Sequence, residues 1–174
     1  MPELPEDLER VLGEGFFIRT TLEKRDGSPR TIETTYYWNG ENKIVLSGYP
    51  GKRDWVASMS RKPTVTLHTV EAEPYYDIPG KARVLRQRKS RMPYLLKFIE
   101  RWTLRPGFPR RRINFLLGAV KINRALHLPW WGPFYFARKI FDGMPCVEIT
   151  FTGDPVKRDG SFPPLTEPRE GRPA

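Results

Sequence analysis

Two turn dipeptides near the start of the chain, Asp26-Gly27 and Asn39-Gly40, separate segments rich in β-branched and aromatic residues. Such dipeptides adopt the positive φ angles of two-residue hairpin turns, whose twist matches that of antiparallel strands. The flanking segments 17–24, 31–38 and 43–47 are therefore predicted to form an antiparallel meander.

The remaining pattern predicts helices and strands around this meander. Further strands are expected at 64–69, 75–85 and 145–151, and helices at 4–13, from Asp54, at 91–102 and at 110–127. A meander with a short helix inserted after its third strand is neither a parallel βαβ sheet nor a plain sandwich. The sequence therefore predicts an α+β, mainly β protein, built as a small antiparallel barrel with inserted and peripheral helices.

The length of 174 residues fits one domain with a short appendage. We expect a domain over 1–153 with a helical insertion at about 91–140. The segment 154–174 is rich in proline, glycine and charge, so it is predicted to be a flexible tail. The acidic start of the chain lacks the basic and apolar regions of a secretory signal, which predicts a cytoplasmic protein.

Metal catalysis is not expected. The chain has one cysteine, Cys146, and two histidines that lie far apart, His68 and His127. This set offers no spacing typical of metal ligands. His68 falls inside a predicted strand and is interpreted as a structural histidine.

The charge balance favours an anionic ligand. The chain carries 30 basic and 20 acidic residues, a net charge of +10. A small anionic molecule, a nucleic acid and an acidic membrane surface all suit such a charge, and charge alone does not choose among them.

The loop at 47–55 holds the highest concentration of candidate ligand-binding residues in the sequence. Gly48 and Gly51 allow close backbone approach, and Lys52 and Arg53 place two cations where a helix begins at Asp54. This arrangement is typical of a phosphate-binding loop, although a loop with two solvated charges remains the alternative. The loop is too short for a Walker motif and lacks its Ser or Thr.

Several segments together resemble a known family. They are Thr31 to Tyr37, Asn39-Gly40, Ile44 to Ser47, Lys52 to Val56 and Lys62 to Leu67. They resemble the split β-barrel flavin and deazaflavin reductases related to pyridoxamine phosphate oxidase. The branch that they resemble most is the deazaflavin-dependent nitroreductase family, which has a tryptophan, a short helix and then an Asn-Pro, Val signature. This chain has Lys62 where that branch often has Asn before the proline. The resemblance covers about 16–86 and leaves 91–140 unmatched.

The resemblance implies an antiparallel split β-barrel and a deazaflavin-dependent reductase. Coenzyme F-420 would give hydride to an electron-poor small molecule such as a quinone, a nitro compound or an activated enone; FMN is the alternative cofactor. Carried over by position, Lys52 and Arg53 would hold the phosphate. The other expected cofactor contacts are Thr34, Thr35, Leu46, Ser47 and Trp55.

Other residues complete the predicted site. Tyr49 and Tyr135 are the candidate proton donors, and Trp130 and Trp131 are expected to line a substrate pocket. The aromatic segment 130–136 could instead be core, a subunit contact or a membrane-facing surface. We expect a homodimer, because the segment 91–140 has the aromatic and arginine-rich composition of interfaces.

A function of another class remains open. The basic clusters at 86–91 and 105–112 could belong to a non-enzymatic module that binds nucleic acid or anionic lipid. The chain lacks the stacking-aromatic motif of a familiar RNA module. We therefore expect no specific nucleic-acid partner, while a peripheral membrane contact stays possible.

Overall fold

The structure is a computed structural model that describes residues 4–105, 107, 109–127 and 133–166. Its strands are β1 (Phe17–Glu23), β2 (Pro29–Trp38), β3 (Lys43–Ser47), β4 (Thr64–Thr69), β5 (Tyr75–Val84), β6 (Cys146–Phe151) and β7 (Val156–Arg158). Its helices are α1 (Glu6–Glu14), α2 (Asp54–Arg61), α3 (Arg88–Trp102), α4 (Arg110–Ala125) and α5 (Pro133–Gly143).

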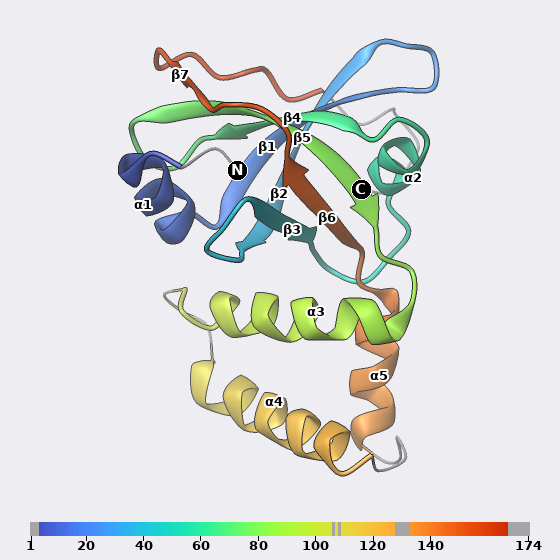
Figure 1. Ribbon diagram of the computed structural model, residues 1–174. Coiled ribbons are helices and arrows are strands. Elements are labelled where there is room, and N and C mark those ends of the chain that lie inside the picture. Colours follow the sequence, from blue (N-terminus) through green and yellow to red (C-terminus); the bar gives the residue numbers. More distant parts are fainter. Residues whose placement is uncertain (1–3, 106, 108, 128–132, 167–174) are drawn as a thin grey trace.

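Six strands of the described chain form a closed antiparallel barrel (Figure 1). Their order is β4-β1-β2-β3-β6-β5, and β4 pairs back onto β5 to close the ring. Gly27 and Gly40 have positive φ angles of 87° and 85°, whereas Asp26 and Asn39 do not. Both hairpins form, but Lys24 bonds Ser28 and Asn39 bonds Lys43, so each turn has three residues between its bonded pair instead of the expected two. The predicted meander and barrel are confirmed.

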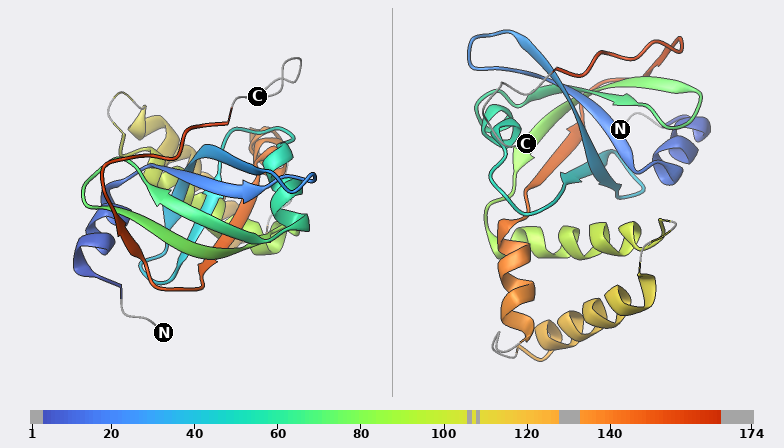
Figure 2. Two further views of the ribbon diagram at one scale, coloured as in Figure 1. Left: turned by 90° about the horizontal axis from the view of Figure 1, so that it is seen from above. Right: turned by 180° about the vertical axis from the view of Figure 1, so that it is seen from behind.

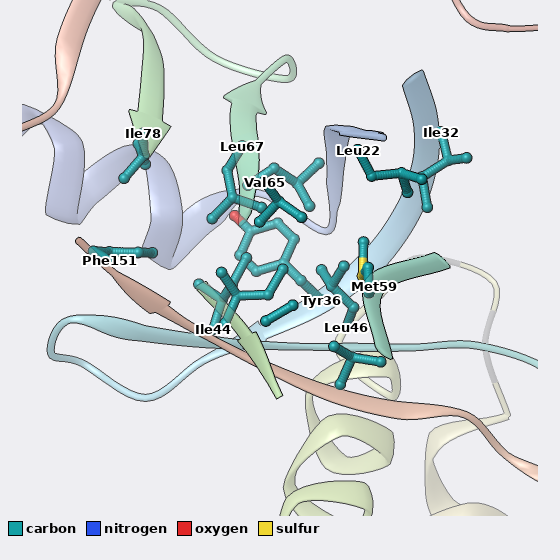
Figure 3. Close-up of a cluster of buried hydrophobic side chains, with 14 of the residues drawn as sticks. Leu22, Ile32, Tyr36, Ile44, Leu46, Met59, Val65, Leu67, Ile78 and Phe151 are labelled. Carbon is teal, nitrogen blue, oxygen red and sulfur yellow. The ribbon is translucent and has the colours of Figure 1, made fainter. Parts of the chain in front are cut away.

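The barrel core consists of the inward-facing side chains of each strand (Figure 3). Helices α1 and α2 lie on opposite sides of the barrel and add Leu8, Leu12, Trp55 and Met59 to this core (Figure 1). The Tyr36 hydroxyl donates to the Leu12 carbonyl across 3.0 Å, which satisfies a buried polar group and ties α1 to β2.

A helical layer covers the outer face of β2, β3 and β6. Val45 and Cys146 form a second apolar cluster with α3, and Leu117 of α4 and Phe141 of α5 complete it. Figure 2 shows α4 on the side of α3 that faces away from the barrel. Within the described residues, no helix combines the length and the apolar character needed to cross a membrane.

The structure describes the predicted flexible tail, 154–174, as far as residue 166, and this part contacts the barrel. Strand β7 pairs with the start of β5, and Arg158 donates to the Thr69 carbonyl at 2.8 Å and binds Asp77. The Phe162 ring packs edge-on against Tyr75 with centroids 4.7 Å apart. Because cation and backbone contacts hold this segment, a count of apolar residues does not detect its order.

This segment covers a polar network on the outer face of the barrel. His68 is buried, with Nδ1 2.7 Å from Asp77 and Nε2 2.8 Å from the Thr21 hydroxyl. Both ring nitrogens have partners, so the interpretation of His68 as a structural histidine agrees with its geometry.

Burial lowers the pKa of His68, with help from the charges of Arg158 and Arg19, and it outweighs the opposing effect of Asp77. The folded protein therefore binds this proton less readily than the unfolded chain does. We predict that the free energy of unfolding falls as pH drops below about 6.5, the pKa of an unperturbed histidine, and that His68→Gln flattens this dependence. Urea titrations at a series of pH values measure the effect. Parallel profiles for the wild type and the variant would show that another group is responsible.

Candidate cofactor-binding site

The barrel leaves one edge of β2 partly unpaired. Strand β3 pairs only with Thr35–Trp38, whereas β2 begins at Pro29. The Tyr36 N–H donates to the Phe16 carbonyl, on the β1 side of β2. The direction of the backbone hydrogen bonds alternates from residue to residue along a strand, so the backbone groups of odd-numbered residues in β2 face away from β1. The first half of β2 therefore presents backbone donors and acceptors at an open edge.

Glu33 lies in the middle of this open edge. On one side of it the N–H and C=O of Thr31 bond Thr166, both at 3.0 Å, and on the other side Thr35 pairs with Ser47. Among the described residues, the N–H and C=O of Glu33 have no hydrogen-bond partner. The Glu33 carboxylate is held aside by Arg19 at 3.0 Å. A ligand with its own donor and acceptor could pair with this free backbone.

The loop 48–53 borders the same edge. It begins after Ser47, which is opposite Thr35, and ends at Asp54, which forms a 2.5 Å ion pair with Arg30. The Gly51 N–H donates to the Gly143 carbonyl across 2.9 Å, which fixes the loop to the end of α5. A Cβ on Gly143 would lie 3.0 Å from that of Pro50, so this contact requires a small residue.

Two cations on this loop are available for an anion. Lys52 is exposed and Arg53 is half-buried, and neither forms an ion pair with any residue that the structure describes. The N-terminus of α2 is less available to an anionic ligand than the sequence suggests. Burial alone would raise the pKa of Asp54, but Arg30 and the N–H groups of Asp54 and Trp55 outweigh burial and hold that pKa below its usual value. A carboxylate thus already occupies this helix N-terminus, which leaves the Lys52 and Arg53 side chains as the groups of this loop that could bind an anion.

The side chains predicted to contact the cofactor ring do not all share one face. Thr34 lies on the inner face of β2 between Ile32 and Tyr36, whereas Thr35 points outward and donates to the Ser47 carbonyl at 2.8 Å. The Leu46 side chain is fully buried in the barrel core, and Trp55 is a core residue too. The Ser47 hydroxyl donates to the Pro145 carbonyl at 2.7 Å. For the core residues Leu46 and Trp55, a side-chain contact with a ring outside the barrel is therefore corrected to a structural role, whereas the Thr34 contact stays a prediction.

The two candidate proton donors are not brought together. Tyr49 lies on the loop and is 76% exposed. Tyr135 is in the first turn of α5, about 12 Å along the helix axis from Gly143, the residue that meets the loop. Within one chain α5 runs away from the barrel (Figure 1), so Tyr49 and Tyr135 lie apart, and a role for Tyr135 stays a prediction. Trp130 and Trp131 lie outside the described residues.

Three residues of this site were missed by sequence reasoning: Arg30, Glu33 and Thr166. Only Glu33 had a usable signal, since the predicted second strand is longer than the third and must leave part of its edge unpaired. The contacts of Arg30 and Thr166 join segments far apart in the chain. The described residues also contain no cluster of three or more histidine, cysteine or acidic side chains that could hold a metal ion.

No protein-family model matches the chain, and no curated protein matches it in sequence. The structure, however, is similar to solved structures. An F420 reductase has a TM-score of 0.51 and 14% identity, covering 86% of this chain and 97% of that chain. A candidate pyridoxamine 5′-phosphate oxidase from Listeria innocua has a TM-score of 0.52 and 10% identity, covering 85% and 93%.

HutZ, the heme storage protein from Vibrio cholerae, is also similar, with a TM-score of 0.57 and 8% identity over 90% of this chain and 95% of that chain. At such identities these likenesses show the fold alone. The fold is the split β-barrel of pyridoxamine phosphate oxidase-like proteins, as the sequence resemblance implied.

We predict that Lys52→Ala combined with Arg53→Ala weakens binding of a flavin-type cofactor at least about 100-fold, since each charge-assisted hydrogen bond contributes about 1.5–3 kcal/mol. Fluorescence titration measures the affinity. The matched control is Arg25→Ala with Lys81→Ala, which removes the same charge from exposed positions outside the loop. Equal weakening by both pairs would mean that net charge, not this loop, binds the cofactor.

The free edge has its own test. Glu33→Pro removes the carboxylate and, of the backbone donors, the one N–H that faces the gap, so the strand can keep its hydrogen bonds to β1. We predict about tenfold weaker cofactor binding than in Glu33→Ala, which keeps the N–H and removes the same carboxylate. Thermal unfolding checks that both variants fold. Identical affinities in two folded variants would remove the Glu33 backbone from the site.

Proposed function

We propose that the protein is an oxidoreductase that binds a flavin-type cofactor along the free edge of β2. The observation that carries the proposal is the Glu33 backbone, which has no partner among the described residues, beside a loop whose two cations, Lys52 and Arg53, form no ion pair with those residues either. A flavin or deazaflavin has the matching parts, namely a ring with adjacent carbonyl and N–H groups and a phosphate on a side chain.

Each part of such a cofactor has a candidate partner in this chain. The Glu33 N–H and C=O would pair with the polar edge of the ring and set its orientation. Lys52 and Arg53 would hold the phosphate. Thr35 and Ser47, whose hydroxyls already bond the backbone, keep the end of β3 fixed next to the ring. These residues fit the cofactor class, and their role is to bind and orient it.

We further propose that the cofactor is a deazaflavin, coenzyme F-420, with FMN as the alternative. The net charge of +10 suits the long acidic tail of the deazaflavin better than the single phosphate of FMN. An F420 reductase is among the structurally similar proteins, and so is a candidate pyridoxamine 5′-phosphate oxidase.

The reaction we propose is reduction of an electron-poor small molecule such as a quinone, a nitro compound or an activated enone. When bound, the deazaflavin supplies hydride from its C5. The chain itself needs no acid–base dyad for that step; it positions the acceptor and provides a proton afterwards. Tyr49, exposed on the loop beside the site, is the candidate donor in this chain, and water is the other source.

Heme binding is less well supported by the residues. Of the two histidines, His68 has both ring nitrogens in hydrogen bonds to Asp77 and Thr21. Ligation of iron by His68 would break this buried network. His127 follows α4 at the far side of the helical layer from the barrel, with a φ of 53°.

The absorption spectrum of the purified protein, with titrations of coenzyme F-420 and FMN, tests the proposal. We expect the deazaflavin to bind at least about tenfold more tightly, because its acidic tail adds charge-assisted contacts. Tighter binding of FMN would select the alternative cofactor. A heme spectrum, or no binding of either cofactor, would contradict the proposed function.

A further inference from the structure

Helix α4 exposes an unusual number of large apolar side chains. Phe115, Ile122 and Leu126 recur at helical spacing, and Leu116 lies next to them; all four are more than half exposed. The buried residues Leu117 and Val120 are on the side that packs in the second apolar cluster. The helix is thus apolar on its outer side as well as on its inner side, and this outer side is called the α4 face below.

The α4 face lies in the part of the chain with the most one-sided charge. The sequence contains no aspartate or glutamate between Glu100 and Asp142. Arg110, Arg111 and Arg112 open the helix, and all three are exposed. Of the other basic residues of α4, Lys121 pairs with Glu100 of α3. Positive charge therefore borders the exposed apolar residues without acidic residues among them.

Helix α5 also exposes a mixture of apolar and basic side chains. Tyr135 and Ile140 are more than half exposed, and Lys139 is exposed between them. In Figures 1 and 2 the barrel lies on the opposite side of α3 from α4. A flat partner that binds α4 would therefore leave the barrel and the candidate cofactor site facing water.

We propose that the α4 face docks onto the surface of an anionic lipid bilayer, with α4 lying in the plane of the headgroups. Such a surface satisfies both halves of the face, because acyl chains accept Phe115, Ile122 and Leu126 while anionic headgroups neutralise the arginines. This proposal does not depend on which cofactor the barrel binds.

Two other partners match only one half of the face. A nucleic acid would neutralise the arginines, but its phosphates would leave the apolar residues in water. A second copy of the chain would cover the apolar residues, but it would bring two clusters of the same charge together. Charge complementarity therefore favours an anionic membrane.

Co-sedimentation of the full chain with vesicles tests the proposal. Vesicles of phosphatidylcholine containing phosphatidylserine are expected to bind the protein, and vesicles of phosphatidylcholine alone to bind it much more weakly. Arg111→Ala with Arg112→Ala should weaken binding about 25-fold, since each basic residue near such a surface contributes about fivefold. Phe115→Ser with Ile122→Ser should weaken binding at least about tenfold while leaving the charge unchanged.

The matched control is Val156→Ser with Leu165→Ser, which removes two exposed apolar side chains from the opposite part of the molecule and should leave vesicle binding unchanged. Equal loss in the control, or no binding to phosphatidylserine vesicles, would overturn the proposal. Binding of duplex RNA near physiological salt would also overturn it, if that binding requires the arginines but not Phe115 and Ile122. Light scattering without vesicles tests whether the α4 face binds a second copy of the chain instead. If the protein self-associates and Phe115→Ser with Ile122→Ser abolishes this, the face is a contact between copies and the proposal is overturned.

Discussion

Strand β2 has ten residues and its partner β3 has five, and the backbone groups left over must find partners elsewhere. Thr166 satisfies those of Thr31 from the far end of the chain. The Glu33 groups remain at the edge among the described residues. The candidate site, the path of the C-terminal segment and the position of the loop 48–53 all depend on this mismatch in strand length.

The fold was largely predictable because its signals are local. The dipeptides Asp26-Gly27 and Asn39-Gly40 set two hairpins, and the helix after Asp54 excludes most other β folds. The side-chain directions in β2 were predictable as well, since alternation puts Thr34 and Thr35 on opposite faces. The resemblance by position grouped them together, although the strand separates their side chains.

What the sequence could not predict are contacts between distant segments. Arg158 binds Asp77 of β5, and the Gly51 N–H reaches the Gly143 carbonyl at the end of α5. Neither has a local pattern. The same holds for Tyr135, because only the direction of α5 shows that it lies far from the loop.

Two groups of basic residues lie in separate regions of this chain. Lys52 and Arg53 lie beside the barrel edge, whereas Arg110, Arg111 and Arg112 lie across the helical layer on α4. The second group is surrounded by exposed apolar residues and therefore suits contact with an extended surface. The first group suits a small, polar anion. A net charge of +10 can therefore reflect two partners of different kinds.

The central claim is that the free edge at Glu33 holds the cofactor ring, and backbone amide chemical shifts test it directly. During titration of the labelled protein with coenzyme F-420, the Glu33 amide and the amides of the loop 48–53 should shift together and saturate at the concentration at which the cofactor signal saturates. Saturation of the cofactor signal with the Glu33 amide unmoved would contradict the account and place the cofactor elsewhere.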